Sequence, residues 1–234
     1  MRLQLVDIKS LPKTSVIDGT PLYTNPIGLI RKFFLKRIEL CISLLEVEEG
    51  NILDVGCGSG ILLPTLSKIK GMIVGIDIHK YLQRVNKYLK KNKFQNICLV
   101  QADSHFLPFR KSVFNAIIMI SLLDHLHKPR LAINELYQMT NSKGIIIFGF
   151  HTNNLFYNIT IFVWTILYVA FYIIIFRKFK EVLTNLFKPN NWRHLYSDSI
   201  LIQWILEKLH VEKQIHLRAV RPVYVAIRSI KKKT

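Results

Sequence analysis

A glycine-rich loop that follows an apolar run has the residue types that hold a small charged ligand. Residues 51–60 read NILDVGCGSG, so an aspartate, Asp54, precedes three alternating glycines. Glycine allows tight turns and close approach of the backbone to a ligand, and a helix that follows favours an anion at its N-terminus. The dinucleotide fingerprint G-x-G-x-x-G requires glycine or alanine where this chain has Ile61. The G-x-G-x-G spacing therefore points away from a dinucleotide.

Two more carboxylates end the next two apolar runs. Asp77 closes IVGID and Asp103 closes LVQAD. At the end of a second parallel strand, a carboxylate is placed to accept hydrogen bonds from a ribose diol. At the end of a third strand, it can accept one from an adenine amino group. Because the carboxyl ends of parallel strands share one edge of a sheet, the pattern predicts a nucleoside site in one crevice.

The elements that must position these residues alternate along the chain. Short apolar runs, typical of strands buried on both faces, are separated by amphipathic helical segments. Strands are expected at 51–55, 72–76, 96–101, 114–121 and 145–150, and helices at 61–70, 81–91 and 129–140. This alternation predicts an α/β fold with a doubly wound, mostly parallel sheet.

The segments LDVGCGSG, VGIDIH, QADSHFLPF, FNAIIMISLLDHLHKP and LAINELYQMTNSKGIIIFG together resemble the class I S-adenosylmethionine-dependent methyltransferases, especially the methyltransferase type 11 group. The resemblance covers Gly50 to Phe150. It implies a Rossmann-like fold and S-adenosylmethionine as the cofactor. Separately, we expect no metal ion. The residues implied to surround the methionine end are Asp54, Gly56, Cys57, Gly58 and Gly60.

The same resemblance implies positions for the rest of the cofactor. Asp77 would bind the ribose, Ile78 would pack on the adenine, and Asp103 with Ser104 would meet the adenine edge. The loop from Ser121 to His125 would lie beside the sulfonium.

Methyl transfer is an in-line displacement in which the protein mainly aligns the acceptor with the methyl group. A hydroxyl or acidic-carbon acceptor also benefits from a base. Asp124 and His125 lie in the loop after the fourth strand, and His151 follows the fifth. Tyr23 is placed to close over the cofactor. We favour His125 as the base, and ordinary loop or packing roles are the alternative for all four residues.

An apolar segment, Leu155–Phe176, carries no formal charge, and as a helix it would be about 33 Å long, enough to cross a bilayer. The chain after Trp192 resembles the family's last helix and two strands, at 198–209, 211–217 and 223–230, which complete the same sheet. Both flanks, each with a net charge of +9, would then lie on one side of a membrane. We therefore expect a re-entrant, interfacial or pocket-covering helix. A single span or a helix buried in protein is the alternative.

The resulting organisation has a polar leader at 1–24, without the apolar run of a signal peptide, and a cofactor-binding core at 25–154. An apolar insertion at 155–180 and a completing segment at 181–234 follow. The core begins with an amphipathic helix, Asn25–Glu46, whose basic face carries Arg31, Lys32, Lys36 and Arg37. We expect this face to be solvated, and contact with lipid headgroups is the alternative. The three cysteines, Cys41, Cys57 and Cys98, have no disulfide or metal-site spacing.

The net charge of +18 fits an anionic membrane, a nucleic acid or a lysine-rich composition equally well. Together these features predict methyl transfer to a lipid-soluble or membrane-associated small molecule, such as a quinone precursor, on the cytoplasmic side of a membrane. The alternatives are a membrane-anchored RNA or protein methyltransferase and a non-catalytic, membrane-bound cofactor-binding protein.

Overall fold

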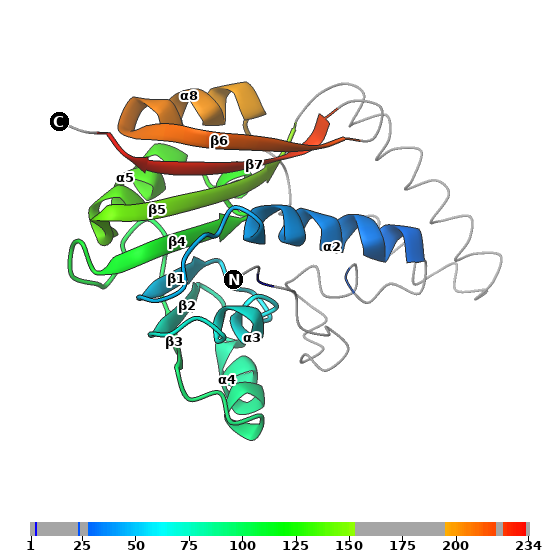
Figure 1. Cartoon of the computed structure of the whole chain (residues 1–234), viewed down its shortest axis with the longest axis vertical. Coiled ribbons are helices and arrows are strands. Elements are labelled where there is room, and N and C mark those ends of the chain that lie inside the picture. Colours follow the sequence, from blue (N-terminus) through cyan, green and yellow to red (C-terminus); the bar gives the residue numbers. More distant parts are fainter. Residues whose placement is uncertain (1–2, 4–22, 24–27, 153–194, 219–221, 233–234) are drawn as a thin grey trace.

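A computed structural model describes residues 3, 23, 28–152, 195–218 and 222–232 (Figure 1). Its strands are β1 (Ile52–Val55), β2 (Ile73–Asp77), β3 (Ile97–Gln101), β4 (Phe114–Ile120), β5 (Thr140–His151), β6 (Leu209–Arg218) and β7 (Pro222–Lys231). Its helices are α2 (Gly28–Ile42), α3 (Leu63–Leu66), α4 (Leu82–Lys91), α5 (Pro129–Met139) and α8 (Asp198–Lys208), with a 3₁₀ turn, η2, at Leu123–His125. The predicted apolar insertion lies outside the described residues.

The seven strands form one sheet in the order β3-β2-β1-β4-β5-β7-β6. The first five strands pair in parallel, and β7 runs antiparallel between β5 and β6. Strand β1 pairs with β2 on one side and β4 on the other, so the strand order reverses there. Ligands of open α/β sheets bind at such a reversal, beyond the carboxyl ends of the strands. The predicted doubly wound, mostly parallel fold is confirmed.

Helices cover both faces of the sheet, which explains the continuous apolar strands (Figure 1). Neighbouring residues of β1 point to opposite faces. Ile52 joins the core built with α2, α3 and α4, whereas Leu53 joins the core built with α5 and α8. Both side chains are completely buried. Both faces of the sheet are therefore packed against helices, and the loops that could bind a ligand lie at its carboxyl edge.

Helix α3 and strand β5 differ in length from the sequence-based expectation. The helix expected at 61–70 spans only Leu63–Leu66, because the chain beyond it is drawn into a bridge between Lys70 and Glu49. Strand β5 starts at Thr140, five residues before its expected beginning, because Thr140 pairs with Phe114 of β4. The pairing shifts register just beyond this point, so residues 141–144, which lie between the expected helix and the expected strand, form an irregular start of the strand.

Helix α2 corrects the prediction for one of its basic residues. Arg37 was expected on the solvated face, but only 4% of its surface is exposed. Its guanidinium lies 4.2 Å from the centre of the Phe34 ring and donates hydrogen bonds to His151 and Tyr23. Lys36 does lie on the exposed face, paired with Glu39 at 3.2 Å. Arginine can lie on an apolar face in this way because its long stem is apolar and its planar head stacks on rings.

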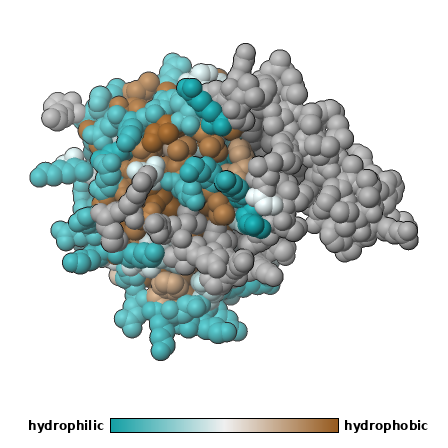
Figure 2. Space-filling model, turned by 45° about the vertical axis from the view of Figure 1, so that its right-hand side comes forward, coloured by the Kyte–Doolittle hydropathy of each residue, from teal (hydrophilic) through white to brown (hydrophobic). Residues whose placement is uncertain are grey.

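Helix α4 has an apolar inner face and a basic outer face. Leu82, Val85 and Leu89 are buried, and the exposed side is basic, with Arg84, Lys87, Lys90 and Lys91. At the height of α4, in the lower part of Figure 2, the visible surface is mainly hydrophilic. Hydrophobic atoms gather higher on the same view. Among the described helices, none is both long and apolar enough to cross a bilayer.

Candidate active site

The glycine loop after β1 has a backbone that other residues adopt only with strain. Gly56 and Gly60 both have φ of +77°, in the left-handed region. A Cβ on Gly56 would lie 2.8 Å from Cδ2 of Leu122, and one on Gly60 would lie 2.7 Å from Cγ1 of Val85. The Gly56 N–H donates to the carbonyl of Ile76, at 2.9 Å, which ties the loop to the end of β2. The loop therefore needs glycine at both positions.

Asp54 is a buried carboxyl group at the base of this loop. Only 3% of its surface is exposed, and within the described part of the chain its Oδ2 has no hydrogen-bond partner. Burial, together with the charge of Asp77, raises the pKa of Asp54 to about 7. A buried oxygen without a partner is costly unless a ligand satisfies it. The ammonium of a methionine moiety is a group of the right charge.

Asp77 and His79 together clamp the middle of the loop. Oδ2 of Asp77 accepts the Gly58 N–H at 2.9 Å, and Oδ1 accepts the His79 N–H at 3.3 Å. Nδ1 of His79 accepts the Tyr81 N–H at 3.1 Å, so its proton is on Nε2, which donates to the Gly58 carbonyl at 3.1 Å. Sequence reasoning found Asp77 but missed His79, whose only signal was its place two residues after that aspartate.

Beyond β2 and β3, two large apolar side chains are exposed. Ile78 is 67% exposed and Phe106 is 71% exposed, an arrangement suited to the flat face of a base. Oδ1 of Asp103 accepts hydrogen bonds from the His105 backbone at 2.9 Å and from its Nδ1 at 2.6 Å. Slight burial raises the pKa of Asp103, but these bonds and the charge of His105 lower it overall. Ser104 beside it is buried. Phe106 was not predicted as a site residue from the sequence.

The loop after β4 contacts the glycine loop, because Leu122 is the side chain packed against Gly56. At its start Ser121 has φ of +53°, which is uncommon for a residue with a Cβ and is often found at functional sites. The Ser121 N–H donates to the Gly149 carbonyl at 2.6 Å, and its Oγ lies 3.2 Å from the hydroxyl of Tyr224. Ser121 is thus held between β5 and β7, close to the glycine loop.

Asp124 lies between the two candidate histidines. It is completely buried, and its Oδ2 lies 3.4 Å from both the backbone N and the Nδ1 of His151. Its Oδ1 lies 3.9 Å from Nε2 of His125, whose side chain is 13% exposed. The other nitrogen of His151, Nε2, accepts a hydrogen bond from Arg37. The Tyr23 hydroxyl also accepts from Arg37, at 3.5 Å, so the structure brings all four proposed catalytic residues into this region.

A buried thiol and phenol, Cys41 and Tyr224, adjoin this cluster and were not singled out from the sequence. Their Sγ and hydroxyl oxygen are 4.0 Å apart. Burial raises the pKa of Cys41 to about 12 and that of Tyr224 well above its usual value. Both groups are therefore neutral at physiological pH, and the Tyr224 hydroxyl acts as a hydrogen-bonding group toward Ser121.

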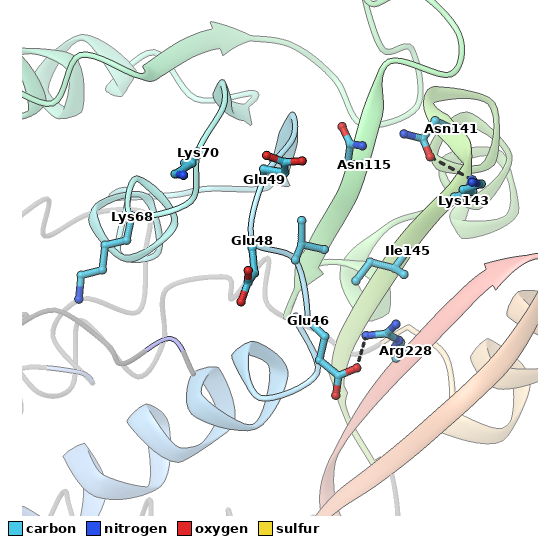
Figure 3. A pocket seen from close by; sticks show the side chains of 11 residues that line it. Glu46, Glu48, Glu49, Lys68, Lys70, Asn115, Asn141, Lys143, Ile145 and Arg228 are labelled. Carbon is cyan, nitrogen blue, oxygen red and sulfur yellow. Dashed lines mark hydrogen bonds and ion pairs between the residues drawn. The ribbon is translucent and has the colours of Figure 1, made fainter. Parts of the chain in front are cut away.

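A cavity of about 690 Å³ lies at the opposite, amino-terminal edge of the sheet (Figure 3). Its lining comes from the segments before β1 and β2, the starts of β4 and β5, and one residue of β7, and includes Glu46, Glu48, Lys70, Asn115 and Lys143. In Figure 3, Arg228 points toward Glu46, with which it forms an ion pair of 3.1 Å. Because the glycine loop and the three strand-end carboxylates lie at the other edge, this cavity is not the candidate cofactor site.

Comparison with known proteins identifies methyltransferases as the proteins that this chain resembles. Residues 53–148 match the family model described as a methyltransferase domain. The chain is 27% identical over 128 residues to a ubiquinone biosynthesis O-methyltransferase of Hydrogenovibrio crunogenus, covering 54% of this chain and 53% of that protein. It is 36% identical over 73 residues to a ubiquinone/menaquinone biosynthesis C-methyltransferase of Wigglesworthia glossinidia brevipalpis, with 29% of each covered. The chain thus spans about half the length, or less, of these curated relatives.

The fold is also that of a solved N-methyltransferase, NodS from Bradyrhizobium japonicum, in complex with S-adenosylhomocysteine. The TM-score is 0.61 at 15% identity, with 92% of this chain and 94% of that one covered. The glycine loop, the buried Asp54 and the exposed Ile78 fit S-adenosylmethionine as the cofactor. Residues 53–148 thus form a methyltransferase domain, in a chain with the fold of the class I S-adenosylmethionine-dependent enzymes.

Proposed function

We propose that the chain transfers the methyl group of S-adenosylmethionine to a hydroxyl group of a small aromatic acceptor of the quinone-precursor type. The observation that carries the proposal is the pairing of a buried carboxylate, Asp124, with a partly accessible imidazole, His125, in the loop that contacts the glycine loop. The names of the two curated relatives, both of ubiquinone biosynthesis, support this class of acceptor.

Burial assigns different roles to the two residues of this pair. Asp124 has no exposed surface, so an acceptor reaches His125 first. When bound, S-adenosylmethionine supplies an electrophilic methyl group on a sulfonium. The acceptor oxygen bonds to this methyl group as the carbon–sulfur bond breaks, with its electrons remaining on sulfur. The hydroxyl proton passes to His125, and Asp124 stabilises the resulting imidazolium. A positioned base contributes about 10²–10⁴-fold to such a step.

We further propose that the acceptor carries an apolar tail and that the chain works on the cytoplasmic side of an anionic membrane. Two features support this: the uncharged segment 155–176, and the exposed basic face of α4. Each basic side chain near an anionic surface contributes about 1 kcal/mol to binding. Co-sedimentation of the full chain with vesicles of anionic phospholipid, compared with neutral vesicles, tests this part. Equal recovery with both kinds of vesicle contradicts it.

Label transfer tests the acceptor. The full chain is incubated with methyl-labelled S-adenosylmethionine and, separately, with a panel of catechols bearing isoprenoid tails, the same compounds with both hydroxyls blocked, total RNA, and a protein extract. We expect label only in compounds with a free hydroxyl, strongly reduced in His125→Ala and retained in Lys36→Met, a control on the exposed face of α2. Label confined to RNA or protein, or no labelled aromatic product while the cofactor still binds, contradicts the proposal.

A further inference from the structure

Arg37 is a buried cation whose charge is balanced through a histidine. Among the described residues, no carboxylate forms an ion pair with it, and its Nε has no hydrogen-bond partner. Its guanidinium faces the rings of Phe34, at 4.2 Å, and Tyr224, at 5.3 Å. Hydrogen bonds connect the guanidinium to the carboxylate of Asp124 through the ring of His151. A buried charge without such compensation costs several kcal/mol.

The direction of these hydrogen bonds fixes the state of the histidine. A guanidinium has only donors and does not lose its proton in proteins, so Nε2 of His151 must accept. The ring is then neutral with its proton on Nδ1, which lies 3.4 Å from Oδ2 of Asp124. The backbone N–H of His151 approaches the same oxygen at 3.4 Å. Asp124 is therefore held on one side, and its other oxygen is directed toward His125.

This geometry changes the role of His151. It was a candidate general base from the sequence, but both of its ring nitrogens are committed, one to Arg37 and one to Asp124. A base needs a free lone pair that faces the acceptor proton. His125 lies on the other side of Asp124 and is partly exposed. The two histidines are thus not equivalent, and Arg37 is what distinguishes them.

We propose that Arg37 is a positioning residue for methyl transfer: it locks His151 in the Nδ1–H tautomer, which holds Asp124 in the orientation that serves His125. The inference rests on the proposed function, because it gives Asp124 its use in the reaction. It adds a residue from helix α2, 87 positions before Asp124 in the sequence, to the machinery of the loop after β4. A wrong tautomer at an Asp–His pair is known to be severely damaging in hydrolases.

The test reads the tautomer directly, in the full chain labelled with ¹⁵N-histidine. Proton–nitrogen correlation spectra at neutral pH assign the ring state of His151, which is identified by its loss in His151→Gln. We expect the Nδ1–H tautomer in the wild type and in Arg37→Lys, which keeps a donor. We expect loss of this single state in Arg37→Met. Lys36→Met, one residue away and on the exposed face, serves as the matched control.

Kinetics complete the test on the same proteins. We expect kcat to fall roughly tenfold or more in Arg37→Met, with cofactor affinity unchanged and partial recovery in Arg37→Lys. An Nε2–H tautomer in the wild type overturns the proposal, and this measurement needs no variant to fold. An unchanged kcat in a folded Arg37→Met protein also overturns it while leaving the proposed function intact. If the wild type methylates no acceptor, the proposed function fails, yet the spectra still decide whether Arg37 sets the tautomer.

Discussion

Replacing Asp54 with asparagine separates two effects of this carboxyl group: its destabilisation of the folded protein and its contribution to cofactor binding. Asparagine has nearly the same shape but cannot ionise. In the cofactor-free protein, burial and Asp77 raise the pKa of Asp54 from 3.8 to about 7. The unfolded chain, in which the group is exposed, loses its proton near the lower value. Between these pH values the folded state therefore binds more protons than the unfolded state, and the free energy of unfolding falls as pH rises.

The structure gives the size of this effect. Between 3.8 and about 7, the lost stability amounts to about 4 kcal/mol, at 1.36 kcal/mol for each pH unit. It is absent at pH 3.8 and below, and complete above pH 7. Without cofactor, Asp54→Asn should therefore be more stable than the wild type by up to about 4 kcal/mol at pH 8, and by little near pH 4.

In cofactor binding, the wild type should have the advantage over Asp54→Asn. If the ammonium of S-adenosylmethionine pairs with the ionised Asp54, binding expels a proton below pH 7. The wild-type dissociation constant should then rise about tenfold for each pH unit below 7. The dissociation constant of Asp54→Asn should be larger than that of the wild type at pH 8 and should change less with pH. Chemical denaturation at pH 5 and 8, together with calorimetry in buffers of different ionisation enthalpy, measures both effects. A lower stability of Asp54→Asn than of the wild type at pH 8 without cofactor would contradict the raised pKa of Asp54. Cofactor binding at pH 6 without proton release would contradict the pairing of Asp54 with the ammonium.

Three further substitutions test the site around it. Gly60→Ala places a Cβ 2.7 Å from Val85 at φ of +77°, so we expect a loss of about 1–3 kcal/mol in the free energy of unfolding, measured in urea. Asp77→Ala should weaken cofactor binding by about 1–3 kcal/mol in a folded domain, measured by calorimetry; an unchanged affinity contradicts its assignment to the ribose. Tyr224→Phe removes the hydroxyl that lies 3.2 Å from Ser121, so we expect a loss of about 1 kcal/mol in thermal unfolding, and no loss would mean that this contact contributes nothing.

The sheet was predictable because strands buried on both faces need long apolar runs. Strand β4 is FNAIIMI, and five of its seven residues are completely or nearly completely buried. Helix α3 was overestimated because apolar spacing does not reveal that Lys70 pairs with Glu49. The start of β5 was missed because polar residues such as Asn141 and Ser142 are typical of a connection between elements, whereas pairing with β4 extends the strand through them.

The cofactor-binding residues could be predicted from the sequence because they follow consecutive strands. The order of these strands along the chain therefore predicts that the residues lie close together. The structure brings the glycine loop and Asp77 into direct contact through the Gly58 N–H. The acceptor side depends on partners far apart in the sequence. Arg37 and His151 are 114 residues apart, and helical periodicity alone placed that arginine in solvent. Burial of a charged side chain depends on such distant partners, which a single sequence does not show.

A crystal structure of the full chain with S-adenosylhomocysteine would show which edge of the sheet binds the cofactor. We expect the ligand at the carboxyl edge of the sheet, with its ammonium at Asp54, its ribose at Asp77 and its base against Ile78. The same structure would show His125 facing the space next to the sulfur. A ligand in the cavity of Figure 3, at the amino-terminal edge, or a carboxyl edge left empty at saturating ligand, would contradict a cofactor site at the glycine loop.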